Sequence, residues 1–140
     1  MLIPGNHFVV YGCGNGHHTL DDLLRKQMDT IYCPVPNFFN ADIGAKVEVC
    51  EVAEGEFEIG TTHIQIYQVN HTPNSVCLGY RLEDGTASLA YLPDVEYLEE
   101  AHLEPALELA RNADLLIHDA YFTTAEYADN ARQGHACDRD

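Results

Sequence analysis

Three residues in the second half of the chain, His71, Asp94 and His135, have the side-chain types that bind divalent metals, although they lie far apart in the sequence. Each follows an apolar run or a turn, where a buried strand can hold a polar side chain at the rim of a sheet. Neutral imidazole and carboxylate are ligands for zinc, manganese and iron. The pattern therefore indicates a metal site assembled from loop ends, although each residue taken alone also fits an ordinary polar rim position.

The charge balance of the chain limits its partners. Seven basic residues against twenty-three acidic ones give a formal net charge of −16. Long-range repulsion at this charge disfavours binding to phosphate backbones, so RNA is a less favoured partner than a small molecule. The densest acidic stretch, residues 48–58, is interpreted as a solvated face.

The cysteines and the apolar runs bear on the cellular compartment. Five cysteines are widely spaced and form no CxxC pair, which argues against a disulfide framework or a cysteine-rich zinc site. The N-terminal residues lack the features of a signal peptide, and no apolar run has the length of a membrane span. We therefore expect a cytoplasmic protein that does not associate with a membrane.

The first part of the chain predicts two strands and a helix. Residues 7–11 are rich in β-forming types and end at a glycine-rich loop, whose spacing fits no phosphate-binding motif. A structural helix is expected over residues 20–28, with Thr19 as its N-cap. Residues 32–41 contain prolines and aromatic residues typical of an irregular loop, and residues 46–52 alternate as a half-buried strand does.

The remaining residues predict a strand meander followed by two helices and a further strand. The alternation of side chains predicts strands over 56–59, 64–69, 76–82 and 88–92, with a hairpin turn at Asp84-Gly85, and together with residues 46–52 these form a meander of about five strands. Helical spacing predicts a helix over residues 95–111 and a weaker one over 123–133, ending at Gly134. The consecutive apolar run 115–117 is typical of a strand buried on both faces. Together these elements predict one α+β domain over residues 1–140.

Four ordered segments carry a resemblance to a known family. They are His71 with the following Gly79-Tyr80-Arg81, then Leu92-Pro93-Asp94, then Leu116-Ile117-His118-Asp119-Ala120, and finally Gly134-His135. In this order they resemble the metallo-β-lactamase superfamily, closest to its ribonuclease Z-like and phosphodiesterase branch. Segments 25–29 and 32–36 also resemble bacterial hydrolases of this superfamily, so the likeness runs through nearly the whole chain. The resemblance implies part of an αβ/βα sandwich, with a mostly antiparallel or mixed sheet and flanking helices.

The resemblance implies a role for each site residue. His71 is similar to a histidine that binds one metal, and Asp94 resembles the carboxylate that bridges two metals, between which a metal-activated hydroxide acts as the nucleophile. His135 resembles the histidine of a Gly-His-Ser-Thr motif, which contacts a phosphate oxygen or protonates the leaving group. His118 and Asp119 resemble a His-Glu-Ala-Thr element, whose acidic member orients a neighbouring histidine. The implied cofactor is a divalent metal, zinc before manganese or iron.

The sequence also departs from the family pattern. The His-x-His-x-Asp-His signature, which supplies most of the metal ligands in the family, does not occur. His17-His18 with Asp21-Asp22 has the right residue types but the wrong spacing, and we interpret it as a helix N-terminus. Ala136-Cys137 replaces Ser-Thr, and Pro93 replaces a small residue. We therefore expect an incomplete domain, without about its first third and its closing strand and helix.

Several hypotheses follow from this comparison. The chain could be a fragment, a degenerate relative, or one piece of a protein completed by another chain. As an enzyme it would be a metal-dependent hydrolase of a small phosphate ester or related ester, with its activity as an isolated chain in question. The alternative is a non-catalytic scaffold, dimerisation or binding module, because an unpaired sheet edge favours a homodimer. A third hypothesis is an unrelated α+β domain in which these are ordinary loop residues.

Overall fold

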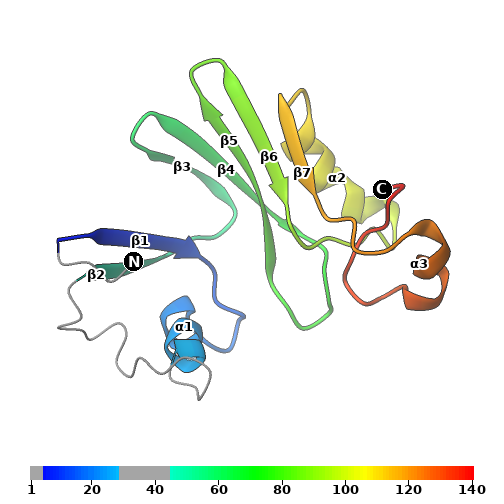
Figure 1. Ribbon diagram of the computed structural model, residues 1–140, viewed down its shortest axis with the longest axis horizontal. Coiled ribbons are helices and arrows are strands. Elements are labelled where there is room, and N and C mark those ends of the chain that lie inside the picture. Colours follow the sequence, from blue (N-terminus) through cyan, green and yellow to red (C-terminus); the bar gives the residue numbers. More distant parts are fainter. Residues whose placement is uncertain (1–4, 29–44) are drawn as a thin grey trace. The chain divides into compact units, whose positions relative to one another are not determined.

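The computed structural model describes residues 5–28 and 45–140 of the chain (Figure 1). The chain divides into two compact units, Met1–Val52 and Ala53–Asp140. The irregular loop expected over residues 32–41 lies outside the described residues. The expectation of a single domain over residues 1–140 stays a prediction.

The first unit contains two strands and one helix. Strands β1 (His7–Gly12) and β2 (Lys46–Glu51) pair in parallel, and α1 (Leu20–Met28) lies between them in the sequence. The hydroxyl of Thr19 accepts a hydrogen bond from the Asp22 N–H at 3.1 Å, which satisfies one of the backbone donors at the start of the helix. The predicted strands, helix and N-cap are therefore confirmed.

The second unit is built on a five-stranded sheet in the order β3-β4-β5-β6-β7 (Figure 1). Neighbouring strands are antiparallel from β3 to β6, and β7 is parallel to β6. The predicted meander is confirmed for β3 to β6, whereas the strand expected to begin it, β2, pairs with β1 in a separate sheet. The hairpin between β5 and β6 turns at Gly85 with a positive φ of 60°. The strands are β3 (Gly55–Ile59), β4 (Thr62–Val69), β5 (Cys77–Asp84), β6 (Ala87–Leu92) and β7 (Leu115–His118).

The core of the second unit lies between this sheet and helix α2 (Glu100–Ala110), drawn in yellow in Figure 1. Leu109 of α2 and Leu92 of β6 are both fully buried there. Gly79 of β5 makes the close approach possible, because a Cβ atom at this position would lie 2.7 Å from each of these two leucine side chains. Arg81 then anchors the helix end by donating from Nη1 to the Leu109 carbonyl at 2.8 Å.

Helix α2 is shorter than the sequence pattern predicts. We expected a helix over residues 95–111, and the helix begins instead at Glu100. Val95 and Glu96 belong to a loop after β6, where the Glu96 N–H donates to the Asn70 carbonyl at 2.9 Å. The Glu96 carbonyl, which in the predicted helix would accept from the Glu100 N–H, accepts instead from Asn70 Nδ2 at 2.7 Å, so the helical spacing of apolar residues extends further than the helix.

The expectation that residues 115–117 form a strand buried on both faces is wrong in its burial. Leu115, Leu116 and Ile117 do form β7, but they are 55%, 46% and 45% exposed. β7 is the last strand of its sheet, and α2 packs chiefly on β4, β5 and β6. In the described part of the chain this apolar edge strand therefore lacks the cover that its sequence anticipates.

The C-terminal segment returns to the strand ends. Helix α3 (Thr124–Asn130) begins with a capping box in which the Thr123 side chain accepts from the Glu126 N–H. It ends at Asn130, before the predicted end at residue 133, and the chain then turns back so that Phe122 and Cys137 form an isolated β-bridge. None of the helices in the described ranges combines the length and apolar character needed to cross a bilayer.

Candidate functional site

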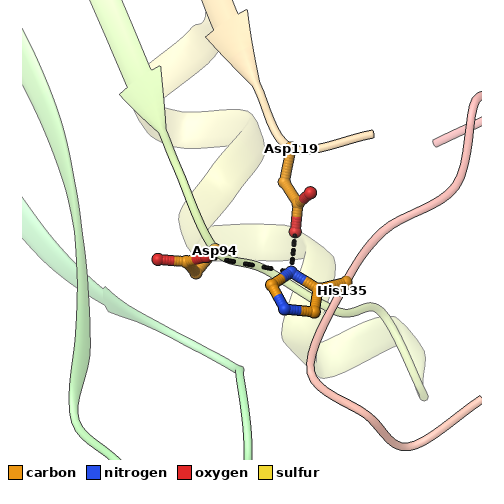
Figure 2. Close-up of side chains that lie close together, drawn as sticks. All are labelled: Asp94, Asp119 and His135. Carbon is orange, nitrogen blue, oxygen red and sulfur yellow. Dashed lines mark hydrogen bonds and ion pairs between the residues drawn. The ribbon is translucent and has the colours of Figure 1, made fainter. Parts of the chain in front are cut away.

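The candidate site lies at one edge of the five-stranded sheet, within the second unit. Strands β4, β6 and β7 run in the same direction, so their C-terminal ends meet at this edge. His71, Asp94 and Asp119 each follow one of these three ends. The segment after α3 then brings His135 beside them. Figure 2 shows Asp94 and Asp119 reaching His135 from two different strand ends.

Three of these side chains converge. Asp94, Asp119 and His135 each offer a ligand atom, and the three atoms lie within 4.8 Å of one another. His135 Nδ1 is 2.9 Å from Asp119 Oδ2 and 3.7 Å from Asp94 Oδ1. Residues that are separate in sequence therefore form one cluster of two carboxylates and an imidazole.

Asp119 is the buried centre of the cluster, with only 8% of its surface exposed. Its Oδ2 accepts hydrogen bonds from the Val95 and Ala136 backbone N–H groups, both at 3.3 Å, and from His135 Nδ1. Its Oδ1 accepts from the Tyr121 N–H at 3.1 Å. Because one carboxylate joins the loop after β6, the loop after β7 and the C-terminal segment, Asp119 fixes their relative positions.

The contact with Asp119 determines the tautomer of the neutral His135 ring. An ionised carboxylate only accepts hydrogen bonds, so Nδ1 of His135 carries the proton and Nε2 carries the lone pair. The ring of Tyr121 stacks on the imidazole with centroids 4.7 Å apart, and the His71 ring meets it edge-on at 5.3 Å. The two ring contacts fix the orientation of the imidazole, and the hydrogen bond to Asp119 fixes its tautomer.

Asp94 is the accessible carboxylate of the cluster, since 49% of its side chain is exposed. Its backbone carbonyl accepts a hydrogen bond from the Cys77 thiol at 3.1 Å, which ties the loop after β6 to the start of β5. The carboxylate itself faces His135 at ion-pair distance. Asp94 therefore combines a fixed backbone with a carboxylate that solvent can reach.

His71 lies beside the cluster in the form that a metal ligand needs. Its Nδ1 is 2.6 Å from the Gly134 carbonyl oxygen, which only accepts, so Nδ1 donates and Nε2 carries the lone pair. A Cβ atom at Gly134 would collide with the His71 ring, and Gly134 has a φ of 91°. Only glycine fits this contact, although His71 is outside the group of three atoms within 4.8 Å.

His118 does not join this convergence. Its Nδ1 is 2.5 Å from the Asp119 carbonyl oxygen, and its Nε2 is 2.8 Å from the Tyr97 hydroxyl. Both ring nitrogens therefore have protein partners, and the catalytic role that the resemblance implies for His118 stays a prediction. Burial, with weaker contributions from the charges of Asp140 and Asp119, raises the pKa of Tyr97 to about 12. The Tyr97 hydroxyl therefore acts as a neutral donor at physiological pH.

Two residues of the site region were not identified from the sequence. Glu96 is fully buried and accepts hydrogen bonds from the segment that carries His135. Tyr121 is 70% exposed and stacks on His135. Glu96 is one of twenty-three acidic residues and lies two positions after Asp94. The one indication of its burial in the sequence is its position between Val95 and Tyr97. Nothing in the sequence marked Tyr121.

Some of the side chains at the site present ligand atoms that suit a divalent cation. Asp94 offers an accessible carboxylate, and His71 offers an Nε2 lone pair whose tautomer is fixed by a backbone carbonyl. Asp119 Oδ2 is instead already engaged by three donors. Asp94 and His71 therefore present ligand atoms that suit a metal, and Asp119 with His135 forms a hydrogen-bonded carboxylate–imidazole pair.

The hydroxyl of Tyr127 yields a pH prediction. It donates to Glu96 Oε1 at 2.9 Å, and burial followed by this hydrogen bond raises the pKa of Tyr127 to about 12. A raised folded pKa means that the contribution to stability is complete below the unfolded value of about 10. That contribution is lost as the pH rises toward the folded value. The difference in phenolate absorbance between the unmodified chain and Tyr127→Phe should therefore appear near pH 12, and a difference centred near the unfolded value would contradict the buried contact.

Solved structures share this fold. Zn²⁺-bound PqqB from Methylobacterium extorquens is 18% identical with a TM-score of 0.60, covering 93% of this chain and 46% of its own. A diphosphatase from the PhnP family is 19% identical with a TM-score of 0.61, covering 96% and 41%. Human tRNase Z, short form, is 15% identical with a TM-score of 0.61, covering 96% and 54%. The chain thus spans about half the length of these structures.

A family model settles the membership of the chain. Among curated proteins there is no significant match. The model described as the Beta-lactamase superfamily domain, in contrast, matches residues 7–138, which is nearly the whole chain. The α+β class, the mixed sheet and the helices agree with the fold expected from the sequence, which is confirmed. The chain therefore belongs to the beta-lactamase superfamily and contains part of the metallo-β-lactamase fold.

Proposed function

We propose that this chain forms part of a metal-dependent hydrolase that acts on phosphodiester or related ester bonds. The observation that supports this proposal is the convergence of Asp94, Asp119 and His135 at one sheet edge, with His71 beside them. Two carboxylates and two imidazoles provide both metal ligands and a proton carrier. The superfamily membership makes this combination of roles the expected one.

Asp94 and His71 are the residues that would hold the metal. The Asp94 carboxylate is accessible, and the His71 ring presents Nε2 because Nδ1 is held by the Gly134 carbonyl. Zinc is the first candidate, supported by the Zn²⁺ of PqqB, and manganese and iron have the same ligand preferences. When bound, a divalent cation supplies a Lewis acid and lowers the pKa of a coordinated water.

Asp119 and His135 are the residues that would handle a proton. Asp119 accepts the His135 Nδ1–H, which leaves Nε2 as the ring nitrogen that can take up and release a proton. Once Nε2 has taken up a proton, the doubly protonated His135 ring can give that proton to the oxygen of a leaving alcohol and return to the neutral form. His118 enters the proposal as a support, because it hydrogen-bonds the backbone carbonyl of Asp119.

A small phosphate ester is the proposed substrate. The net charge of −16 disfavours RNA, because long-range repulsion acts on a polyanion more strongly than on a single ester. The structural likeness to a diphosphatase of the PhnP family supports the same substrate class. Within the ribonuclease Z-like and phosphodiesterase branch, we therefore group this chain with the members that act on small substrates and not with those that process RNA.

Metal content tests the proposal directly. The purified chain is stripped with a chelator, reloaded with zinc, desalted and measured by elemental mass spectrometry together with its oligomeric mass. We expect at least one zinc per chain, and hydrolysis of a chromogenic phosphodiester that depends on this zinc. A folded chain that retains no zinc would overturn the proposal.

The second candidate function is a scaffold or dimerisation module, which the exposed apolar strand β7 favours. Leu115, Leu116 and Ile117 are each about half exposed at the sheet edge, where a second copy of the chain could pair. The same mass measurement separates the two candidates. A homodimer without zinc would support the scaffold, whereas zinc bound to the chain would support the hydrolase.

A further inference from the structure

We propose that Glu96 is a positioning residue that holds His71 and the segment carrying His135 in the arrangement the metal site needs. This inference rests on the proposed function for its metal, but the positioning itself can be tested without metal. Glu96 is fully buried, at 0% exposure. A buried carboxylate is costly unless it is fully hydrogen-bonded, so the groups that surround it indicate what it holds in place.

All three donors to the Glu96 side chain come from the C-terminal part of the unit. Oε1 accepts from the Tyr127 hydroxyl at 2.9 Å and from the Arg132 backbone N–H at 2.5 Å. Oε2 accepts from the Gly134 N–H at 2.9 Å. The carboxylate therefore spans from α3 to the turn that immediately precedes His135, and it provides the acceptor for two backbone donors of that turn, one of them the N–H of the buried Gly134.

The contact with Gly134 connects Glu96 to His71. Gly134 accepts a hydrogen bond from His71 Nδ1 at its carbonyl oxygen and donates one to Glu96 Oε2 from its N–H. Glu96 thus holds the glycine whose carbonyl fixes the tautomer of the proposed metal ligand. The collision that any Cβ at Gly134 would make with the His71 ring shows how closely the two are packed.

The backbone of Glu96 holds Asn70, the residue that precedes His71. Its N–H donates to the Asn70 carbonyl at 2.9 Å, and its carbonyl accepts from Asn70 Nδ2 at 2.7 Å. Asn70 directly precedes His71, so Glu96 fixes the loop after β4 by its main chain and the turn before His135 by its side chain. One residue two positions from Asp94 therefore aligns the three segments that carry His71, Asp94 and His135.

Glutamine is the substitution that tests this role most closely. An amide has nearly the same shape but replaces one acceptor oxygen with a donor, so Glu96→Gln cannot accept from both Arg132 N–H and Gly134 N–H. The matched control is Glu104→Gln, which removes the same charge from an exposed position on α2. Both variants are compared with the unmodified full chain, and circular dichroism verifies that each is folded.

The primary measurement is NMR of the imidazole nitrogens in the isotope-labelled, metal-free chain. We expect His71 to carry its proton on Nδ1 in the unmodified chain and in Glu104→Gln, and to lose this single tautomer in Glu96→Gln. A general loss of stability in a folded protein would not change the tautomer of the His71 ring alone. A folded Glu96→Gln variant with an unchanged His71 tautomer would overturn the proposal.

Two further measurements keep the inference separate from the proposed function. If the unmodified chain binds zinc, Glu96→Gln should raise the zinc dissociation constant about tenfold to a hundredfold, and an unchanged constant would count against the inference. If the chain binds no zinc, the hydrolase proposal fails, while the tautomer still decides the role of Glu96. If Glu96→Gln does not fold, a through-hydrogen-bond NMR correlation between the Gly134 N–H and the Glu96 carboxylate of the unmodified chain decides it. Its absence would overturn the proposal.

Discussion

Zinc binding is expected to fall by roughly a hundredfold or more when Asp94 is replaced by alanine, because even partners that only orient a ligand contribute about tenfold to a hundredfold. Asp94 belongs to the cluster of three ligand atoms and carries its accessible carboxylate. The backbone of Asp94, which accepts from the Cys77 thiol, is unaffected by the substitution. The free energy of unfolding should therefore change little. Zinc titration and denaturant unfolding of the same sample measure the two effects.

Asp129→Ala provides the matched control for this prediction. Asp129 is an exposed aspartate on α3, so its substitution removes the same charge from the same unit. We expect its zinc affinity to equal that of the unmodified chain. Equal affinities for Asp94→Ala and Asp129→Ala would mean that Asp94 does not hold the metal.

Asp119→Asn is expected to reduce hydrolysis by the zinc-loaded chain by roughly a hundredfold or more while zinc remains bound, since general acid–base catalysis contributes about 10² to 10⁴. The four donors around Asp119 require an acceptor at each position, and an amide supplies only one oxygen. His135 then loses the partner that fixes its Nδ1 proton. The free energy of unfolding should also fall by about 1–3 kcal/mol, because a buried N–H loses its acceptor.

Asp114→Asn tests whether the loss of hydrolysis could come only from the loss of an aspartate that accepts hydrogen bonds. Asp114 also accepts hydrogen bonds from a backbone N–H and a hydroxyl, both of Ser88, but it is exposed and precedes the opposite end of β7. Hydrolysis should be unchanged in this variant. If Asp119→Asn instead abolishes zinc binding in a folded chain, then Asp119 is a metal ligand and the assignment of the cluster changes.

Most elements of the fold follow from the pattern of residues along the chain. Alternation of side chains between turn residues predicts β2 to β6, because a strand with one buried face tends to place apolar residues at every second position. Thr19 was recognised as an N-cap because its hydroxyl can satisfy a backbone donor of the first turn. His71, Asp94 and His135 were singled out because polar residues after strand ends have a rigid support.

Tertiary structure alone decided how the site is held together. Helical spacing could not show that α2 begins at Glu100, because Glu96, four residues earlier, hydrogen-bonds to Asn70, a partner distant in sequence. The exposure of β7 depends on its place at the sheet edge, which its apolar sequence does not encode. In the sequence Glu96 is one acidic residue among many. Only in the folded chain do Tyr127, Arg132 and Gly134 donate hydrogen bonds to its carboxylate. Hydrogen bonds between distant loops leave no periodic trace in a sequence, so only the folded chain distinguishes the carboxylates that hold the site from those that face solvent.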